Sequence, residues 1–264
     1  RVHRSRDRRA VVAVWVTGPR GRETSALLRH LDPVEAARAA ALPPDQAARF
    51  VVARALLRGV LGERLGCAPR DVDLRVACAS CGGPHGRITV AGPPGGEPLH
   101  VSLTRSGPRV AVALTTAGPV GVDVASPAAV GAAPLAGVAL SAAERRRHDR
   151  SRPGPDRGPD AGLAHVWVSK EAALKALGTG LLVDPADLEL GGAGGPRGGV
   201  AHHRGTVLAI APLLLGPGVV GAVAVAAPSA ASPGPRWVAR RAGRPVVDVR
   251  VHDGAAVLAR LAAG

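Results

Sequence analysis

The sequence predicts an α+β protein built from two similar halves that pack side by side. Short apolar runs of strand length alternate with longer stretches in which leucine and alanine recur at helical spacing. Along the 264 residues the order is strand, helices, strands, and then strands, helices, strand. A chain of this length forms one large domain or two of about 100–150 residues. No repeat is visible in the letters, so the similarity of the halves rests on element order.

An arginine-rich segment precedes the first expected strand. Five of the first nine residues are arginine, and Val11–Val16 is an apolar run. This run has only the minimum length of a signal-peptide core and no small-x-small cleavage site follows it, so we interpret it as a strand. The apolar segment 211–227 is too short to span a membrane and is interrupted by Gly216-Pro217-Gly218. We therefore expect a cytoplasmic protein with no membrane partner.

Two helices are expected after this strand. Asp32 is a suitable N-cap for the first, with Pro33 at the first helical position. The second follows Pro44 and runs toward Gly66, because its large apolar residues recur at helical spacing.

Arg54 and Arg58 share a different face of this second helix. Arginines in such a position usually form a solvated surface, but they also suit a cationic edge that contacts a ligand. The sequence leaves both interpretations open.

Glycine and proline separate the remaining elements. We expect strands over Leu99–Leu103, Val110–Leu114 and Val120–Val124, a helix after the capping-box sequence Ser141–Glu144, a helix over Leu163–Leu177 ended by Gly178, and a strand over Val219–Ala226. The Gly/Pro-rich segments Ser151–Gly162 and Gly191–Gly205 are expected to be loops.

This pattern divides the chain into four parts. They are an arginine-rich tail over residues 1–10, an N-terminal subdomain over 11–115, a C-terminal subdomain with the chemistry over 116–227, and an appendage over 228–264. Within the appendage, Val246–Val251 alternates like a strand but has no obvious partner. The appendage is either disordered or covers a sheet edge.

The chain is strongly basic, with a net charge of +14. This charge indicates an anionic partner, or else a codon bias toward arginine together with an arginine-rich tail. A nucleic-acid binder is one class that it suggests. With no tyrosine, a single phenylalanine and only 2% aromatic residues, the chain is poor in side chains on which bases stack, and it shows no recognised binding motif. We therefore expect no nucleic-acid partner.

Three cysteines, an odd number, do not form a disulfide framework. Cys78 and Cys81, with His85 nearby, have knuckle-like spacing, but a structural zinc site needs four ligands. We interpret this segment as a loop.

Both lysines of the chain lie in one short segment, Trp167–Gly178, whereas 32 arginines are spread along the sequence. Their position suggests that a compact ammonium group is needed there. Glu171 and Lys175 are one helical turn apart, on one face. This arrangement predicts either an exposed salt bridge or a carboxylate that binds a divalent cation beside an ammonium that binds phosphate.

Two other segments carry candidate site residues. Asp123 lies between valines in an expected strand, where a carboxylate is unfavourable unless it is paired or metal-bound. Val101–Gly107 runs from a strand into a loop that contains Arg105 and Ser106. Hydroxyl groups, backbone amides and a guanidinium together suit a phosphate monoester.

In this order, the three segments resemble the motifs of the Sfp-type 4′-phosphopantetheinyl transferases, in particular bacterial, actinobacterial-like members. The family carries a Phe-Asn-Leu-Ser-His-Ser-like loop, then Gly-x-Asp-x-Glu, then Trp-x-x-Lys-Glu-(Ser/Ala)-x-x-Lys. Residues Trp167–Lys175 match the last motif completely, whereas Val101–Gly107 and Gly121–Ala125 match in part. The resemblance covers about Val34–Ala227 and implies two α/β subdomains related by a pseudo-twofold axis.

The resemblance implies a function. The protein would transfer 4′-phosphopantetheine from coenzyme A to a serine of an apo acyl or peptidyl carrier protein, with Mg²⁺, and would release 3′,5′-ADP. Asp123 and Glu171 would bind the metal, and Glu171 would also be the base. Lys175 would bind the pyrophosphate, with Lys170 near the phosphates. Two similar halves in one chain favour a monomer.

The resemblance also assigns residues to coenzyme A. Arg105 occupies the position of the family's histidine and would face the 3′-phosphate, beside Ser106. Arg54 would contact the nucleotide end.

One departure concerns the metal. The family's Gly-x-Asp-x-Glu ends here in Ala125, so one usual carboxylate is absent. Fewer charged ligands weaken divalent-cation binding. The alternative is therefore a coenzyme A-binding protein with impaired transfer activity.

Overall fold

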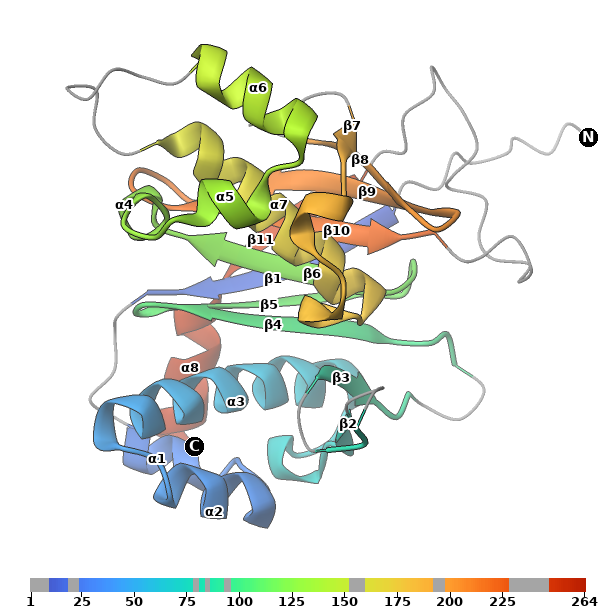
Figure 1. Ribbon diagram of the computed structural model, residues 1–264. Helices are drawn as coiled ribbons and strands as arrows, with labels where there is room; N and C mark the ends of the chain where they lie inside the picture. The colour runs from blue at the N-terminus through green and yellow to red at the C-terminus, as the bar shows by residue number, and fades with distance from the viewer. Residues whose placement is uncertain are drawn as a thin grey trace, which may run out of the picture.

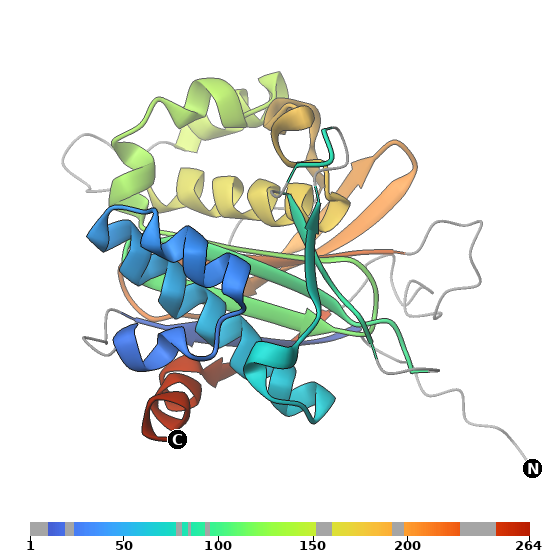
Figure 2. The ribbon, with the colours of Figure 1, turned by 90° about the horizontal axis from the view of Figure 1, so that it is seen from below.

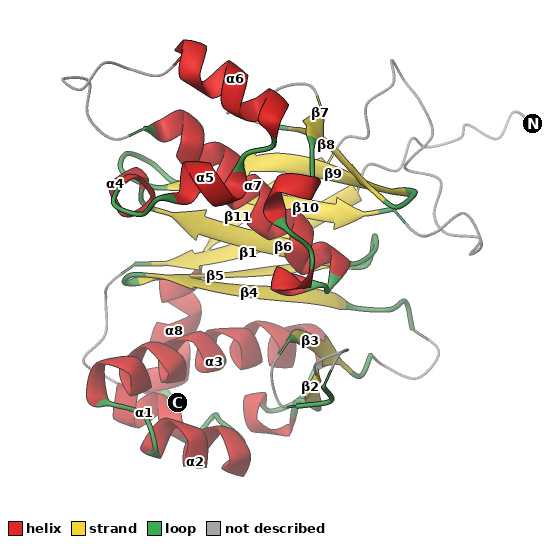
Figure 3. Ribbon diagram, viewed as in Figure 1, coloured by secondary structure: helices red, strands yellow, loops and turns green. Residues whose placement is uncertain are grey.

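The computed structural model describes residues 10–18, 24–77, 81–83, 86–92, 96–151, 160–191, 198–227 and 247–264. These residues form four layers, with helices on the two outer faces and two β-sheets between them (Figures 1 and 3). The arginine-rich residues 1–9, most of the tail expected at the N-terminus, lie outside this part of the chain. The fold is α+β, as predicted.

The first sheet has the strand order β11-β1-β5-β4. Its strands are β1 (Ala10–Thr17), β4 (His100–Ser106), β5 (Arg109–Thr115) and β11 (Val247–Asp253). Its outer face is covered by α1 (Thr24–Leu28), α2 (Pro33–Ala40), α3 (Pro44–Leu65) and α8 (Gly254–Ala263) (Figure 1). A two-stranded sheet, β2 (Leu74–Ala77) and β3 (Arg87–Val90), lies beside α3.

The second sheet has the strand order β6-β10-β9-β8-β7. Its strands are β6 (Val120–Ala125), β7 (Leu190–Gly191), β8 (Gly199–His203), β9 (Thr206–Leu213) and β10 (Val220–Ala226). On its outer side lie α4 (Pro127–Gly131), α5 (Leu135–Ala139), α6 (Ala142–Ser151) and α7 (Ala161–Leu177). Of these, α7 packs directly along β6 and β10.

The two halves repeat one topology. Each runs strand, helix, strand, strand, as β1-α3-β4-β5 and as β6-α7-β9-β10. In each sheet the first strand pairs with the last, and the last pairs with the middle one. Buried small residues such as Val14, Val122 and Val223 fill the space between the sheets. The prediction of two similar α/β halves is therefore confirmed.

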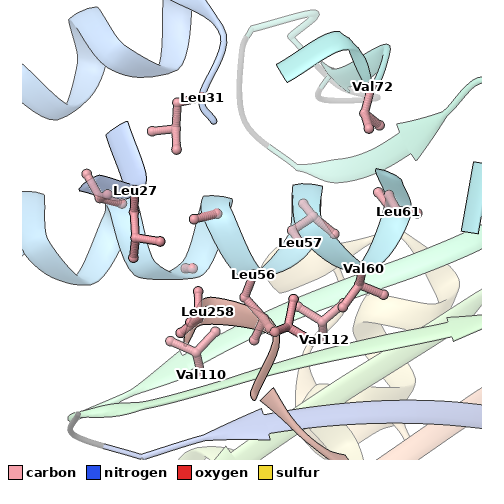
Figure 4. Packing of buried hydrophobic residues seen from close by; sticks show 14 of the residues in the cluster. Leu27, Leu31, Leu56, Leu57, Val60, Leu61, Val72, Val110, Val112 and Leu258 are labelled. Atoms are coloured by element: carbon pink, nitrogen blue, oxygen red, sulfur yellow. The ribbon is translucent and has the colours of Figure 1, made fainter. Parts of the chain in front are cut away.

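The helix α3 covers the first sheet through a leucine- and valine-rich face. Leu56 and Val60 are almost fully buried and pack toward Val110 and Val112 of β5 (Figure 4). The helix begins at Pro44, with Pro43 as its N-cap, and Gly66 ends it in the left-handed conformation with φ 71°. The predicted course of this helix is confirmed.

The C-terminal segment completes the first half. Strand β11 pairs in parallel with β1, and Trp15 stacks on His252 with ring centroids 4.9 Å apart. Helix α8 then packs on α3, where a Cβ at Gly59 would lie only 2.9 Å from side-chain atoms of Val257 and Leu261. Residues 247–264 of the appendage thus extend a sheet and bury part of α3; residues 228–246 lie outside the described chain.

One predicted loop is in part a hairpin. Within Gly191–Gly205, residues Gly199–His203 form β8, which pairs with the unpredicted strand β9. Arg204 and Gly205 both have positive φ, 44° and 80°, as a two-residue hairpin turn requires. The prediction of a loop was therefore wrong for Gly199–His203. Residues 192–197 lie outside the described part.

Candidate functional site

The candidate site lies where the edge strand of one sheet meets the edge strand of the other. Strand β6 runs beside β4, and hydroxyl side chains of β4 join the two. Val122 donates its amide to Ser102 Oγ at 3.1 Å, and Thr104 donates its hydroxyl to Asp123 Oδ1 at 2.7 Å. Asp123 is only 7% exposed. These bonds hold its carboxylate in place.

The ammonium group of Lys175 is bonded to this carboxylate. Its Nζ lies 2.6 Å from Asp123 Oδ1, 3.1 Å from Thr104 Oγ1 and 3.2 Å from the carbonyl oxygen of Val122. A lysine has three N–H donors, so each has an acceptor here. The side chain nevertheless remains 29% exposed. Lys175 is thus both oriented by protein oxygens and accessible to a ligand.

Gly121 explains how α7 comes so close to β6. A Cβ at this position would collide with the carbonyl oxygen of Ala172 and would lie 2.6 Å from the amide nitrogen of Ala176. Gly121 and Asp123 are two residues apart and therefore share one face of the strand. The glycine admits the helix backbone, and the helix then brings Lys175 to the aspartate.

Glu171 lies one turn before Lys175 on α7, and the charges of Lys175 and Asp123 both act on its carboxyl group. Burial raises the pKa of its carboxyl; the Lys175 charge lowers it and the Asp123 charge raises it. Among the residues described, the ion pair of Lys175 is with Asp123 and none joins it to Glu171. The interpretation of Glu171 and Lys175 as an exposed salt bridge is therefore wrong.

The donor set fits a hard divalent cation. Asp123 and Glu171 offer carboxylate oxygens, and the described residues contain no cluster of three or more His, Cys, Asp or Glu side chains. Ala125 follows on the same face of β6, 7% exposed, in the apolar cluster around α7. Magnesium commonly binds with one or two carboxylates, water and substrate phosphates, so Asp123 and Glu171 are the type of ligand that this ion needs.

Lys175 also lines a cavity of about 210 Å³. Other residues around this cavity are Arg87, Ser102 and Gly178. A second cavity of about 410 Å³ shares the lining residues Gly86, Ile88 and Leu103 with the first. The two spaces therefore adjoin, and the second contains a group of arginines.

This arginine group surrounds the only phenylalanine of the chain. The guanidinium carbons of Arg38 and Arg105 lie 5.4 and 5.9 Å from the ring centroid of Phe50. Burial lowers the pKa of Arg105, and the charges of Arg38, Arg54 and Arg49 lower it further. Repulsion among these cations would be relieved by a bound anion.

Arg54 and Arg58 are buried, 8% and 0% exposed, so the prediction of a solvated face is wrong. Arg54 is paired with Glu35, and Arg58 donates to Glu35 at 2.5 Å and also to Asp32. Three backbone carbonyls around Val72 accept from Arg58 as well. Because these acids come from α2 and its N-cap, they were not evident from the sequence of α3. Arg54 lines the larger cavity, whereas Arg58 holds its wall together.

The ammonium group of Lys170 is bonded to Glu144, and not to Asp123 as that of Lys175 is. It is fully buried, and its Nζ donates to Glu144 at 2.5 Å and to the carbonyls of Ala139 and Pro185 at 2.7 and 2.8 Å. Burial lowers the pKa of Lys170, against the opposing effect of Glu144. Lys170 lines neither of the two cavities. The capping box of Ser141 and Glu144 is present, with bonds of 2.9 and 3.2 Å.

Ser106 and the segment with Cys78, Cys81 and His85 were also singled out in the sequence. Ser106 ends β4, paired with Arg109 across a turn, and lines neither cavity. Cys81 is exposed, whereas Cys78 and His85 lie outside the described chain.

Several residues of the site were not predicted. Thr104, Arg38 and Arg87 come from three separate elements, and no local motif connects them. Thr104 had one usable signal, because Ser102 and Thr104 put hydroxyls at alternate positions of an apolar strand. Arg38 and Arg87 had none, because only the tertiary fold brings them to the cavities.

Residues 119–209 match the family model of the 4′-phosphopantetheinyl transferase superfamily. The matched segment contains β6 and α7 and so includes Asp123, Glu171 and Lys175. No curated protein matches the chain. Within the described residues, no helix is long and apolar enough to cross a membrane. The match supports assignment of this segment to the superfamily and a transferase activity of the type that the superfamily has.

Proposed function

We propose that the protein transfers 4′-phosphopantetheine from coenzyme A to a serine of an apo acyl or peptidyl carrier protein, in a Mg²⁺-dependent reaction that releases 3′,5′-ADP. One observation carries the proposal. Lys175, bonded to Asp123 and one helical turn from Glu171, lines a cavity that adjoins an arginine-rich one. A long, polyanionic substrate such as coenzyme A needs cationic groups at both ends of such a space. The superfamily match over these residues supports the same conclusion.

The charges suggest the orientation of coenzyme A. The nucleotide end, with its 3′-phosphate, would lie in the larger cavity against Arg38, Arg54 and Arg105. Phe50 would add an apolar surface there. The pyrophosphate would then reach the smaller cavity, where Lys175 would move from protein oxygens toward phosphate oxygens. In this position Lys175 would neutralise charge on the leaving phosphate.

The transfer is a displacement at phosphorus. The carrier serine oxygen would form a bond to the pantetheine-side phosphorus, and the bond from that phosphorus to the bridging oxygen of the pyrophosphate would break. Glu171 would take the serine proton, directly or through a water. Magnesium held by Asp123 and Glu171 would supply charge neutralisation on the phosphates.

A test follows from these roles. An apo carrier protein incubated with this protein, coenzyme A and Mg²⁺ should gain the mass of one phosphopantetheine group. EDTA and Glu171→Gln should each abolish the gain. Transfer that is equally fast in EDTA would contradict the metal dependence, and no transfer to acyl or peptidyl carriers would contradict the proposal.

The absence of a carboxylate at Ala125 supports a second candidate, a coenzyme A-binding protein with impaired transfer. If the missing carboxylate limits the reaction, Ala125→Glu should raise turnover sharply, whereas the matched Ala125→Gln should not. High wild-type turnover that Ala125→Glu does not increase would exclude this candidate. Denaturation of both variants would control for packing around α7.

A further inference from the structure

Arg87 connects the two halves of the molecule at the end of the helix that carries Lys175. It lies on β3, whose hairpin belongs to the N-terminal half, and Figure 2 shows this hairpin beside the end of α7. Its Nη2 donates to the carbonyl oxygen of Ala176 and, at 3.4 Å, to that of Lys175. The acceptors are thus the backbone of Lys175 itself and of the next residue.

These carbonyls belong to the last turn of α7. In that turn no further helical amide is available, and the carbonyls carry the negative end of the helix dipole. The Lys175 carbonyl also accepts from Gly178, the left-handed residue that ends the helix. A guanidinium with several donors in a rigid fork is well suited to bind adjacent carbonyls at such an end.

Gly178 makes room for this contact. It has φ 75°, and a Cβ there would lie 2.9 Å from the guanidinium carbon of Arg87. The glycine therefore has two roles: it adopts the left-handed conformation and it admits the arginine. Burial lowers the pKa of Arg87, as expected for a guanidinium enclosed between β3 and α7.

The same contact borders the smaller cavity. Arg87, Gly178 and Lys175 all line it, while neighbouring Gly86 and Ile88 line both cavities. A two-stranded hairpin such as β2–β3 is only marginally stable by itself. Its attachment to α7 through Arg87 therefore fixes a wall that the two cavities share.

We propose that Arg87 is a positioning residue, which holds the last turn of α7 so that, before coenzyme A binds, the Lys175 ammonium lies on Asp123 and faces the cavity. The geometric part of this proposal does not depend on the reaction; its kinetic part rests on the proposed transfer function. Arg87 acts through the backbone of α7 and is not itself required to contact coenzyme A.

The two-lysine composition provides a direct test. Selective ¹³C labelling of lysine should give two sets of side-chain NMR signals, one for Lys170 and one for Lys175, assigned with Lys175→Met. Arg87→Ala should shift or broaden the Lys175 signals and leave those of Lys170 unchanged. Arg75→Ala is the matched control, because Arg75 lies on the partner strand β2, is exposed and pairs only locally with Asp73.

Unchanged Lys175 signals in Arg87→Ala would overturn the proposal. Equal changes in both lysines would also overturn it, because they would indicate a general loosening of α7. Neither result depends on whether the protein transfers phosphopantetheine.

Steady-state kinetics test whether the positioning of Lys175 by Arg87 affects the rate of transfer. Arg87→Ala should lower kcat for transfer by about 10–100-fold, the range expected when a catalytic group is misplaced by about 1 Å, with KM for coenzyme A unchanged. Arg87→Lys should recover part of kcat, because an ammonium can still bind one carbonyl. Added guanidinium ions should partly restore Arg87→Ala, and Arg75→Ala should behave as wild type. A raised KM with normal kcat would instead assign Arg87 to coenzyme A binding and overturn the positioning role.

Discussion

The two lysines of the chain lie five residues apart on α7 and occupy opposite kinds of environment. Lys170 is fully buried and bonded to Glu144 and two carbonyls, so all its donors serve the fold. Lys175 is bonded to three oxygens as well, but its side chain is 29% exposed and lines a cavity. Similar hydrogen bonding thus accompanies different exposure of the two side chains. Access to a ligand, and not the number of bonds, distinguishes the site lysine from the structural one.

The largest expected effect concerns the buried pair. Lys170→Met should lower the free energy of unfolding by about 3–5 kcal/mol, because it leaves the carboxylate of Glu144 buried without its cation. Urea denaturation would measure the loss. The double variant Lys170→Met/Glu144→Leu should recover part of it, because both charges are then removed. A single variant as stable as wild type would show that Lys170 is not a structural residue.

The second prediction concerns Lys175, for which we expect a large loss of activity and a small loss of stability. Lys175→Met should lower kcat for transfer by about 100–1,000-fold, since it removes a cation from the leaving phosphate. Its stability loss should be smaller than that of Lys170→Met, about 1–2 kcal/mol, because Asp123 keeps Thr104 and water can enter. Steady-state transfer assays and urea denaturation would test both parts. A large stability loss with near-normal kcat would remove the distinction between the lysines.

The close approach of α7 to β6 gives the third prediction. Gly121→Ala should cost about 1–3 kcal/mol of stability, because its Cβ would meet the backbone of α7. Transfer should fall as well, since the helix carries Glu171 and Lys175. Gly131→Ala is the control: no atom lies within 4 Å of a Cβ there, so stability should stay the same or rise slightly. Equal stability of the two variants would show that the helix can move without cost.

The smallest effect concerns pH. The pKa of Glu171 is raised in the folded protein, chiefly by burial, so ionisation of this group disfavours folding. The wild type therefore loses stability as the pH rises from the ordinary glutamate pKa through the raised one. Glu171→Gln should be the more stable form above that range, with the difference vanishing in acid. Denaturation at several pH values would show it, and a variant less stable at neutral pH would contradict the assigned burial effect.

Local signals in the sequence predicted much of the fold. The caps at Asp32, Gly66 and Gly178 and the alternating apolar strands have causes within a few residues, so their positions could be predicted. The β8–β9 hairpin was missed because its turn, Arg204-Gly205, is not one of the common Asn-Gly or Asp-Gly pairs. The partner of β11 lies more than 200 residues earlier in the chain, where no local pattern identifies it.

In the candidate site too, residues with a local signal were predicted and those brought together by the tertiary fold were not. Asp123, Glu171 and Lys175 were found because a carboxylate between valines and two rare lysines are unusual in this sequence. The burial of Lys170 was not foreseen, because Glu144 and the carbonyls that bond it come from other elements. The convergence of arginines from α2, α3 and β4 around Phe50 also depends on the tertiary fold.

The most direct measurement is the intact mass of an apo carrier protein incubated with coenzyme A, Mg²⁺ and either the wild type or Lys175→Met. We expect the wild type to add one phosphopantetheine group, and Lys175→Met to add it at least 100-fold more slowly while remaining folded. Equal rates for the two proteins would contradict the assignment of Lys175. Absence of any mass gain with the wild type, across acyl and peptidyl carriers, would contradict the transferase function itself.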